Sequence, residues 1–369
     1  MANNNVDRFQ TFVMAILLIM LLGWLLEAGK GIALPVLGAI MWLYIITGAA
    51  NALGRWPLVK YLPLFVRRML IFIAFVVGLT MFGGALVVTV ERILENIPLY
   101  QSNLETMMVK TLDYFGIENP QELLMFQNIE QGQIRFQQVL AAVVISVSGI
   151  GGTVSLILIY ATFLMAERGS FSAKLALALP SKHEVDRTQA ILHDINNKIG
   201  DYLAAKTLIN IILAVVSFAI IRAFGIPNAL FWALLIGLLN YIPYVGSLIA
   251  VLFPVILTLA HSGSIERTLS VAAALTLAQW LVGNVLEPRM LGKQMNLSPF
   301  VVIVSLSVWY ALLGVGGAIL AVPLTSMIAI ILAAYEPTKP YAILLAQDIE
   351  AVKANDLPKL DPKTKVLLP

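Results

Sequence analysis

The chain has no cysteine, few histidines and little charge, and each of these shortages excludes a class of protein. Without cysteine it can form neither a disulfide framework nor a thiolate metal site. The three histidines, His183, His193 and His261, do not cluster, so we expect no metal site. Only 12% of the residues are charged, whereas soluble domains contain about 25%. The composition therefore excludes an ordinary soluble domain.

Catalytic and nucleotide-binding motifs are also missing. Asp, Glu, His and Ser occur in no hydrolase-like spacing, and no glycine loop of the Walker type is present. The net charge is only +3 and no basic tract indicates nucleic acid binding. We therefore expect no enzyme, no cofactor and no ATP-driven pump. Any transport by this chain would be secondary or passive.

Apolar residues, in contrast, are abundant. They make up 59% of the 369 residues, and the mean hydropathy is +0.87. A membrane-spanning helix needs about 20 such residues, so the sequence predicts an all-α polytopic membrane protein with about eight transmembrane elements. In chain order, the predicted elements are Phe12–Leu26, Ile32–Ala50, Met69–Val90, Val139–Met165, Thr207–Phe224, Pro227–Ala260, Thr268–Leu286 and Pro299–Ala334.

Two of these elements are too long for one simple span. Pro227–Ala260 is interrupted by the segment Asn240–Gly246 and by Pro254, and Pro299–Ala334 by several glycines and a proline. Each could be one kinked helix or a hairpin whose turn lies at membrane depth, and we favour hairpins. The expected hinge or turn positions are Pro243, Pro288, Gly314, Gly316, Gly317 and Pro323.

The placement of lysine and arginine predicts the orientation. The loop after the second predicted span holds Arg55, Lys60, Arg67 and Arg68 without an acid, so it is expected to be cytoplasmic, and both termini with it. The predicted domains are three N-terminal spans (1–90), an extracytoplasmic amphipathic helical insertion (91–138), a fourth span (139–166), a cytoplasmic helical insertion (167–206), a C-terminal transport module with broken helices (207–335) and a cytoplasmic tail (336–369).

Both insertions have the apolar period of a helix. In the first, Leu104, Met108, Leu112 and Phe115 share one face. In the second, Ile191, Ile195, Ile199 and Tyr202 do the same. Neither insertion has a catalytic pattern. We expect each to lie on the membrane or to pack on a neighbouring subunit.

Polar groups at membrane depth are the candidates for function. On a regular helix Gln279, Gly283 and Glu287 form one stripe, with Asn284 beside it and Pro288 and Arg289 just after it. A carboxylate at mid-membrane costs roughly 2.5–3.5 kcal/mol on insertion scales, so Glu287 is a candidate ion or proton site. The alternative is that Glu287 caps a helix end or pairs with an arginine at the membrane edge. We expect Arg289 to hold a bidentate partner.

A second polar group surrounds Pro243. Asn240, Tyr241, Tyr244 and Ser247 flank this proline, which removes one backbone hydrogen bond from a helix. Free carbonyls and amide side chains of this kind can bind a polar solute or Na⁺. The alternative is a structural turn with its tyrosines at the membrane interface.

Ordered motifs in the C-terminal third resemble those of one family. They are Gly225-Ile226-Pro227, Asn240-Tyr241-Ile242-Pro243-Tyr244-Val245-Gly246-Ser247, Gly283-Asn284-Val285-Leu286-Glu287-Pro288-Arg289, Leu297-Ser298-Pro299, and Gly314-Val315-Gly316-Gly317 with Ala321-Val322-Pro323-Leu324. On these motifs the chain resembles the autoinducer-2 exporter (AI-2E) family, bacterial inner-membrane permeases similar to the PerM group. The resemblance implies a homo-oligomer, expected to be a pentamer, that exports small solutes. The best-known proposed solute of the family is the uncharged furanone signal of quorum sensing, and some members are described as Na⁺/H⁺ antiporters.

Three functions remain open at this point. Export of a small, polar, mostly uncharged solute leads, because the polar groups at membrane depth are mainly amides and hydroxyls. The alternative is Na⁺(Li⁺)/H⁺ antiport through Glu287, the one intramembrane acid that the pattern shows. A non-transporting membrane scaffold, assembled through the two insertions, is the third.

Overall fold

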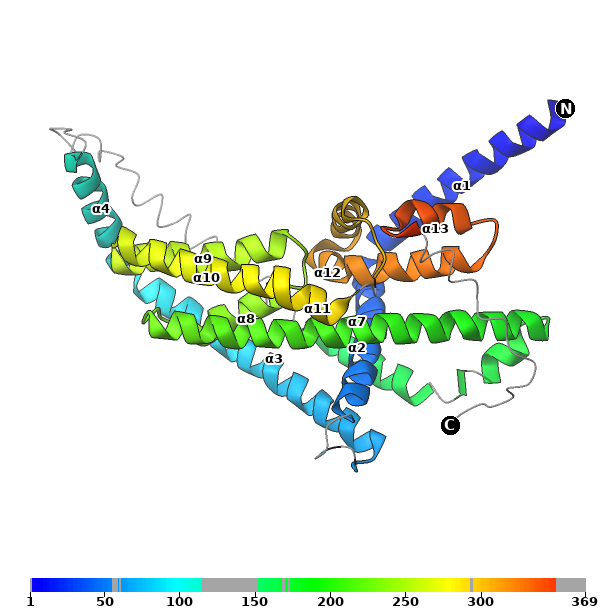
Figure 1. The fold of residues 1–369 in the computed structure, drawn as a ribbon, viewed down its shortest axis with the longest axis horizontal. Helices are drawn as coiled ribbons and strands as arrows, with labels where there is room; N and C mark the ends of the chain where they lie inside the picture. Colours follow the sequence, from blue (N-terminus) through cyan, green and yellow to red (C-terminus); the bar gives the residue numbers. More distant parts are fainter. Residues whose placement is uncertain are drawn as a thin grey trace. The chain divides into compact units, whose positions relative to one another are not determined.

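A computed structural model describes residues 2–54, 59, 61–114, 152–167, 170–171, 173–292 and 295–349 (Figure 1). Every regular element in these ranges is a helix, so the predicted all-α fold is confirmed for them. Internal contacts divide the chain into two compact units. The first unit comprises 1–48, 153–203 and 293–369, and the second comprises 49–152 and 204–292.

The first unit is built around α12. Its helices are α1 (Ala2–Ala28), most of α2 (Lys30–Leu53), Gly152–Glu167, the N-terminal half of α7 (Lys182–Ala223), α12 (Pro299–Ala334) and α13 (Lys339–Leu345). Helix α12 contacts both α1 and α13. Its N-terminus is fixed by Ser298, whose backbone N–H donates to the carbonyl of Leu345 at 3.0 Å.

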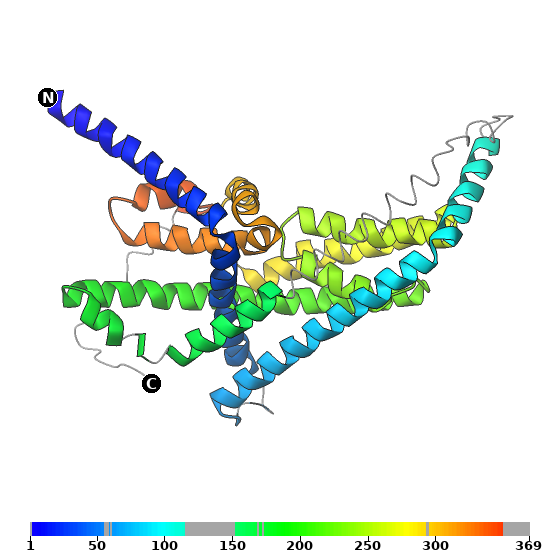
Figure 2. The ribbon, with the colours of Figure 1, turned by 180° about the vertical axis from the view of Figure 1, so that it is seen from behind.

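The second unit is organised around α9. Its helices are α3 (Leu64–Glu95), α4 (Ile97–Tyr114), the C-terminal half of α7, α8 (Ala229–Leu239), α9 (Val245–Ser262), α10 (Ile265–Leu281), the π-helix η1 (Val282–Leu286) and α11 (Glu287–Leu291). Helix α9 packs against α4, α8 and α10, and α3 packs against α8. Helices α9 and α10 run side by side in both Figure 1 and Figure 2. The apolar core includes the fully buried side chains of Ile209, Leu213, Ile236, Val271 and Leu275.

The helices are long enough for a membrane protein. Among the described residues, six helical segments have the length and apolar composition to span a bilayer: α2, α3, α7, α9, the segment Ile265–Leu291 and α12. Shorter apolar helices occur at Ile16–Ala28, Gly152–Glu167 and Ala229–Leu239. Every predicted span has a helix here, except that residues 139–151 of the fourth span lie outside the described residues.

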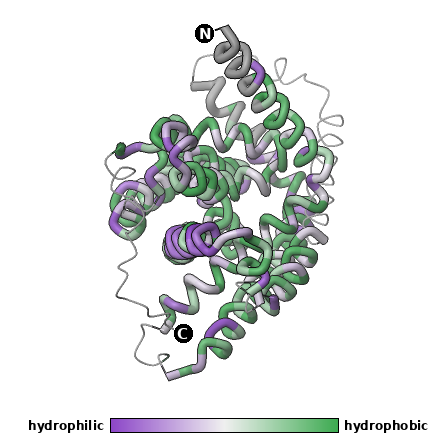
Figure 3. The backbone as a smooth tube through the Cα atoms, turned by 90° about the vertical axis from the view of Figure 1, so that its right-hand side faces the viewer, coloured by the Kyte–Doolittle hydropathy of each residue, from purple (hydrophilic) through white to green (hydrophobic). Residues whose placement is uncertain are grey.

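Helix α7 differs from the expectation. The predicted cytoplasmic insertion, from Lys182 onward, and the predicted span Thr207–Phe224 form one continuous helix of 42 residues, Lys182–Ala223. The insertion half carries most of the hydrophilic residues of this helix, and hydrophilic residues appear in purple in Figure 3. Its apolar face is buried within the chain itself, with Ile195 and Ile199 at 2% and 0% exposure. This face therefore needs neither the membrane surface nor a neighbouring subunit to cover it. The corresponding side chains of the first insertion, from Leu104 to Phe115, lie outside the described residues.

The stretch Pro227–Ala260 is a hairpin, as expected. Helices α8 and α9 contact each other, and the chain turns between them at residues 240–244, which include Pro243. Pro243 was expected to leave a backbone carbonyl free four residues earlier, at Leu239. That carbonyl instead accepts a hydrogen bond from the Ile242 N–H at 2.9 Å. The turn also depends on Gly246, since a Cβ at this position would lie 1.8 Å from the Leu239 carbonyl oxygen. Only a residue without a side chain permits this approach.

The stretch Pro299–Ala334 also folds back on itself. A straight helix would separate residues 309 and 325 by about 24 Å, yet Trp309 Nε1 donates to Thr325 Oγ1 at 3.0 Å. The turn is at Gly314, whose backbone angles are φ 68° and ψ −152°, a region that glycine adopts readily. Of the four expected break positions, Gly314 alone is non-helical; Gly316, Gly317 and Pro323 lie in the helix that follows it.

Candidate functional site

Polar side chains from three segments of the second unit meet among its apolar helices. They come from α7, from the turn after α8, and from the segment Ile265–Leu291. We call this group the polar cluster; its members are Lys206, Thr207, Asn210, Asn240, Tyr241, Gln279 and Glu287. Because α7 and Ile265–Leu291 are among the helices able to span a bilayer, the cluster lies on candidate membrane-spanning elements.

Helix α7 contributes one face. Lys206 and Asn210 are four residues apart and therefore lie one above the other on the same side of the helix. Both are buried, at 4% exposure each. Ser217, seven residues after Asn210 and 1% exposed, continues this face through the apolar part of α7.

Helix α8 passes close to α7 at a glycine. A Cβ added to Gly237 would lie 3.0 Å from the Asn210 carbonyl oxygen and 3.1 Å from the Ala214 Cβ. Small residues allow helix backbones to approach in this way within membranes. The close crossing places the end of α8, and with it Asn240, beside Asn210.

Three amides form a chain of hydrogen bonds. Gln279 Nε2 donates to Asn240 Oδ1 at 2.8 Å, and Asn240 Nδ2 donates to Asn210 Oδ1 at 2.8 Å. Within the described residues the two ends of the chain are open: Gln279 Oε1 is buried without a hydrogen-bond partner, and Asn210 Nδ2 has none of normal geometry, although Asn210 lies beside the Tyr241 hydroxyl. Exchanging N and O in all three amides reverses the direction of the bonds but still leaves one atom unpaired at each end.

An ion pair lies in the same cluster. Lys206 Nζ is 2.6 Å from Glu287 Oε1, and the side chains are 4% and 26% exposed. Glu287 therefore forms an ion pair, as the second interpretation of the sequence predicted, but its partner is a lysine and not an arginine. Next to Lys206, the hydroxyls of Thr207 and Tyr241 share a hydrogen bond of 2.7 Å.

A π-helical segment brings Gln279 and Glu287 to one face. On a regular α-helix, positions eight apart are rotated by about 80° from each other, because each residue adds about 100°. Between α10 and α11, however, η1 carries the wider π geometry, in which the Glu287 N–H donates to the Val282 carbonyl, five residues earlier. A π turn holds an additional residue and removes most of this offset. The helix therefore changes from α to π geometry before Pro288 and continues through Pro288 without a break.

Other residues that were predicted near this stripe lie outside the polar cluster. Gly283 and Asn284 are exposed, and the Asn284 amide donates to the Trp280 carbonyl of its own helix at 3.1 Å. Arg289 is exposed and has no hydrogen bond or ion pair to any described residue, so the expected bidentate partner is not found there. Tyr244 is 60% exposed, and Ser247 Oγ donates only to the Tyr244 carbonyl.

The sequence interpretation found Asn240, Tyr241, Gln279 and Glu287 but missed the whole contribution of α7. Lys206 was included in the cytoplasmic insertion and Asn210 was passed over within an apolar run. The signal was nevertheless present, because Lys206 and Asn210 stand at a helical spacing of four at the start of a span. Polar residues in such positions are usually directed into the protein.

Comparison with known proteins adds a family to this geometry. Residues 14–337 match the profile described as AI-2E family transporter. YhhT of Escherichia coli (strain K12), named only as a candidate transport protein, is 29% identical over 343 residues, covering 90% of this chain and 92% of its own length. TqsA of the same strain, named as an AI-2 transport protein, is 28% identical over 318 residues, covering 85% of this chain and 89% of its own. A candidate transport protein of Haemophilus influenzae is 32% identical over 212 residues, 57% of this chain and 60% of its own.

Proposed function

Because the chain belongs to the AI-2E family of transporters, we propose that it is a secondary transporter of the bacterial inner membrane that exports a small, polar, mostly uncharged solute. The relative named as an AI-2 transport protein supports a solute of the furanone signal class. The polar cluster binds the solute, with Asn210, Asn240 and Gln279 as the principal contacts and Tyr241 and Thr207 beside them.

The open ends of the amide chain carry this proposal. In the described part of the chain, Gln279 Oε1 and Asn210 Nδ2 are buried without partners of normal hydrogen-bond geometry, although buried polar atoms are nearly always hydrogen-bonded. One end offers an acceptor and the other a donor. A hydroxylated solute supplies both kinds of group, so it can complete the two ends at once.

The ion pair suits an uncharged solute. Lys206 and Glu287 neutralise each other at 2.6 Å, and the remaining members of the cluster are amides and hydroxyls. The cluster therefore carries no net charge when both groups are ionised. A charged solute would leave its charge without a counter-ion among apolar helices, which is costly.

The direct test is accumulation of labelled autoinducer-2 in everted membrane vesicles, in which export becomes uptake. Vesicles with the chain should accumulate the label, and Gln279→Leu and Asn210→Leu should lower the rate about tenfold, since each removes one hydrogen-bonding group. Asn284→Leu is the matched control, because this amide is exposed and outside the cluster. Accumulation no greater than in vesicles lacking the chain would exclude this solute.

Antiport of Na⁺ or Li⁺ against H⁺ is the second candidate, and the Lys206–Glu287 pair favours it. A proton on Glu287 would cancel the carboxylate charge that holds Lys206, whereas deprotonation would let a cation compete with the ammonium for the same oxygens. Everted vesicles that hold a proton gradient distinguish the candidates. Addition of Na⁺ or Li⁺ should dissipate the gradient under antiport and leave it unchanged under solute export.

The assembly proposed is a homo-oligomer, with a pentamer as the expected form and both termini in the cytoplasm. Exposed apolar residues on α3, such as Phe65, Ile73 and Met81, supply surface for contacts with lipid or with a second copy. Mass measurement of the purified chain in detergent tests the stoichiometry. A monomeric mass under conditions that preserve transport would contradict it.

A further inference from the structure

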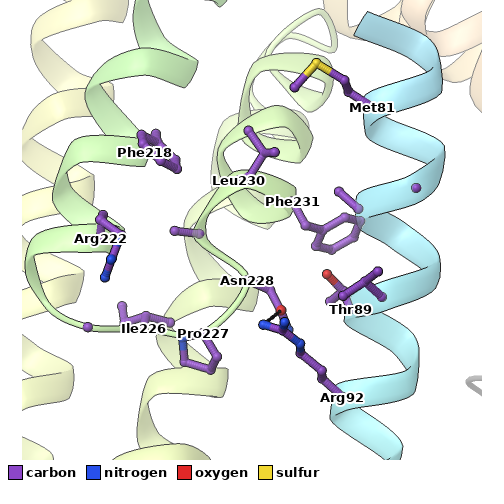
Figure 4. A pocket seen from close by; sticks show the side chains of 15 residues that line it. Met81, Thr89, Arg92, Phe218, Arg222, Ile226, Pro227, Asn228, Leu230 and Phe231 are labelled. Atoms are coloured by element: carbon purple, nitrogen blue, oxygen red, sulfur yellow. Dashed lines mark hydrogen bonds between the residues drawn. The ribbon is translucent and has the colours of Figure 1, made fainter. Parts of the chain in front are cut away.

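A cavity of about 640 Å³ lies in the second unit between α3, the C-terminal end of α7 and the start of α8 (Figure 4). Its size is within the range of ligand sites, about 300–1,000 Å³. Of its fifteen lining residues, only Thr89, Arg92, Arg222 and Asn228 have polar side chains. None of the polar cluster lines it, so it is a separate site from the one proposed for the solute.

One arginine lines the cavity from α3 and one from α7, on the two sides of the loop that leads into α8 (Figure 4). Arg92 is in the last turn of α3 and Arg222 in the last turn of α7, and both are exposed. Arg92 gives one N–H to Asn228 Oδ1 at 3.2 Å, and neither guanidinium forms an ion pair within the described residues. None of the described lining residues is acidic. Two unneutralised guanidinium groups are a typical recognition site for a phosphate.

A buried hydroxyl lies one helical turn before Arg92 on α3. Thr89 is 2% exposed, and no described residue forms a hydrogen bond with its Oγ1. Figure 4 shows the Thr89 side chain on the cavity side of α3. Helical threonines often donate to a carbonyl of their own helix, as Thr80 does to Val77 at 2.9 Å. Thr89 therefore lies in the wall of the cavity with the hydrogen-bonding capacity of its hydroxyl unused by the described residues.

Beyond Thr89 the wall of the cavity is apolar. Along α3 the lining continues through Val88, Ala85 and Gly84 to Met81. From α8, Phe231 forms part of the wall and stacks on Phe82 of α3 with ring centroids 5.8 Å apart. Met81 and Arg92 are eleven residues apart, which is about 16 Å of helix and close to half of the 30 Å hydrocarbon core.

We propose that this cavity binds one anionic phospholipid. The order of groups along α3 follows the order of groups in the lipid: the arginines hold the phosphate, the Thr89 hydroxyl donates to an ester carbonyl, and the apolar wall receives one acyl chain within a single leaflet. A soluble phosphate has nothing to place against the apolar wall, so the lipid is the occupant that fits the whole cavity.

The test measures retained lipid on the purified full-length chain by native mass spectrometry, with phosphatidylglycerol and phosphatidylcholine of identical acyl chains. The wild type should retain phosphatidylglycerol about tenfold better: both lipids offer the same phosphate, but the choline ammonium of phosphatidylcholine is repelled by the two arginines. Arg92→Ala with Arg222→Ala should abolish this preference. Arg289→Ala, which removes an exposed arginine that does not line the cavity, should leave it intact.

A second variant fills the apolar part without touching the arginines. A Cβ at Gly84 meets nothing within 4 Å, so Gly84→Leu should fold and occupy the space of the acyl chain. Retention of both lipids should then fall, again about tenfold. Equal retention of the two lipids by the wild type would overturn the proposal. Displacement of phosphatidylglycerol by glycerol 3-phosphate would also overturn it, because it would indicate that the ligand is a soluble anion. A smaller oligomer in Gly84→Leu would overturn it too, because it would indicate that a second copy of the chain fills the cavity.

Discussion

The Lys206 ammonium and the Glu287 carboxylate form an ion pair of 2.6 Å between residues that are 81 positions apart in the sequence. Lys206 is almost fully buried, whereas about a quarter of the Glu287 side chain is exposed. The pair therefore ties α7 to the segment that follows the π-helix, and its acidic member can still be reached by a proton or a cation.

Glu287→Gln should destabilise the protein. The substitution keeps the shape of the side chain but leaves the buried Lys206 ammonium without its counter-charge, which in buried pairs costs about 3–5 kcal/mol. We expect the lower end of this range or less, because the partial exposure of Glu287 screens the pair. The measurement is the loss of monodisperse protein on heating, followed by size-exclusion chromatography in detergent.

The double variant Lys206→Met with Glu287→Gln separates structure from mechanism. It removes both charges, so most of the lost stability should return. If Glu287 carries a coupling proton, this stable variant should transport without the pH dependence of the wild type. An unchanged pH profile in the double variant would remove Glu287 from the coupling step, and a double variant less stable than Glu287→Gln would contradict the pairing.

Asn240→Leu should cost more stability than Gln279→Leu. Asn240 is the middle amide, and its removal leaves Gln279 Nε2 and Asn210 Oδ1 without their partners. Each buried group left without a hydrogen-bond partner lowers the free energy of unfolding by about 1–3 kcal/mol. Gln279→Leu leaves only one such group, Asn240 Oδ1. Thermal unfolding of the two variants, measured side by side, gives the order. Equal losses would show that the three amides do not act as a chain.

The sequence predicted the helical fold and the hairpin at Pro243 because these follow from apolar length and from local breaking residues. It could not predict the π-helix, since the extra residue of that turn depends on packing that local spacing does not encode. The stripe of Gln279, Gly283 and Glu287 was therefore wrong at Gly283, which is exposed. The sequence places Lys206 in the cytoplasmic helical insertion because a lysine beside a span normally indicates the cytoplasmic side, whereas in the structure it pairs with an acid distant in sequence.

Gly246→Ala should disrupt the α8–α9 hairpin, whereas Gly283→Ala should not affect folding. The new Cβ at position 246 would lie 1.8 Å from the Leu239 carbonyl oxygen, a backbone atom that cannot move aside without opening the turn. We expect a loss of at least about 2–3 kcal/mol, as in severe overpacking. Gly283 is the matched control, because its Cβ would meet nothing within 4 Å. Yield and thermal stability in detergent measure the difference; similar values for the two variants would contradict the close approach at Leu239.

Gly317→Ala should be more harmful than Gly316→Ala, although the two glycines are adjacent. At position 317 the Cβ would lie 2.0 Å from the Trp309 backbone carbonyl oxygen, so the fold at Gly314 would have to open. At position 316 its nearest neighbour is the end of the Leu34 side chain, at 2.7 Å, which can rotate away. Thermal stability of the two variants tests the prediction, and the reverse order would show that α12 does not fold back between Trp309 and Thr325.

Cysteine labelling tests the side on which the α8–α9 hairpin returns. The chain has no native cysteine, so one substitution gives one reporter. With the hairpin, residue 266 at the start of α10 is expected on the same side as Arg222, the extracytoplasmic side in the predicted orientation. Glu266 is exposed, so Glu266→Cys should react in intact cells with a thiol reagent that cannot cross the membrane.

Glu336→Cys is the control for this labelling, because its side chain is 84% exposed and it begins the predicted cytoplasmic tail. It should react only after the cells are opened. Reporters on opposite sides of the membrane require an odd number of crossings between residue 266 and the tail. The segment α10–α11 supplies one crossing, and the folded-back α12 adds none if it begins and ends on the same side. Labelling of both cysteines in intact cells would instead require α12 to cross the membrane once, and its turn at Gly314 would then be a kink within a span.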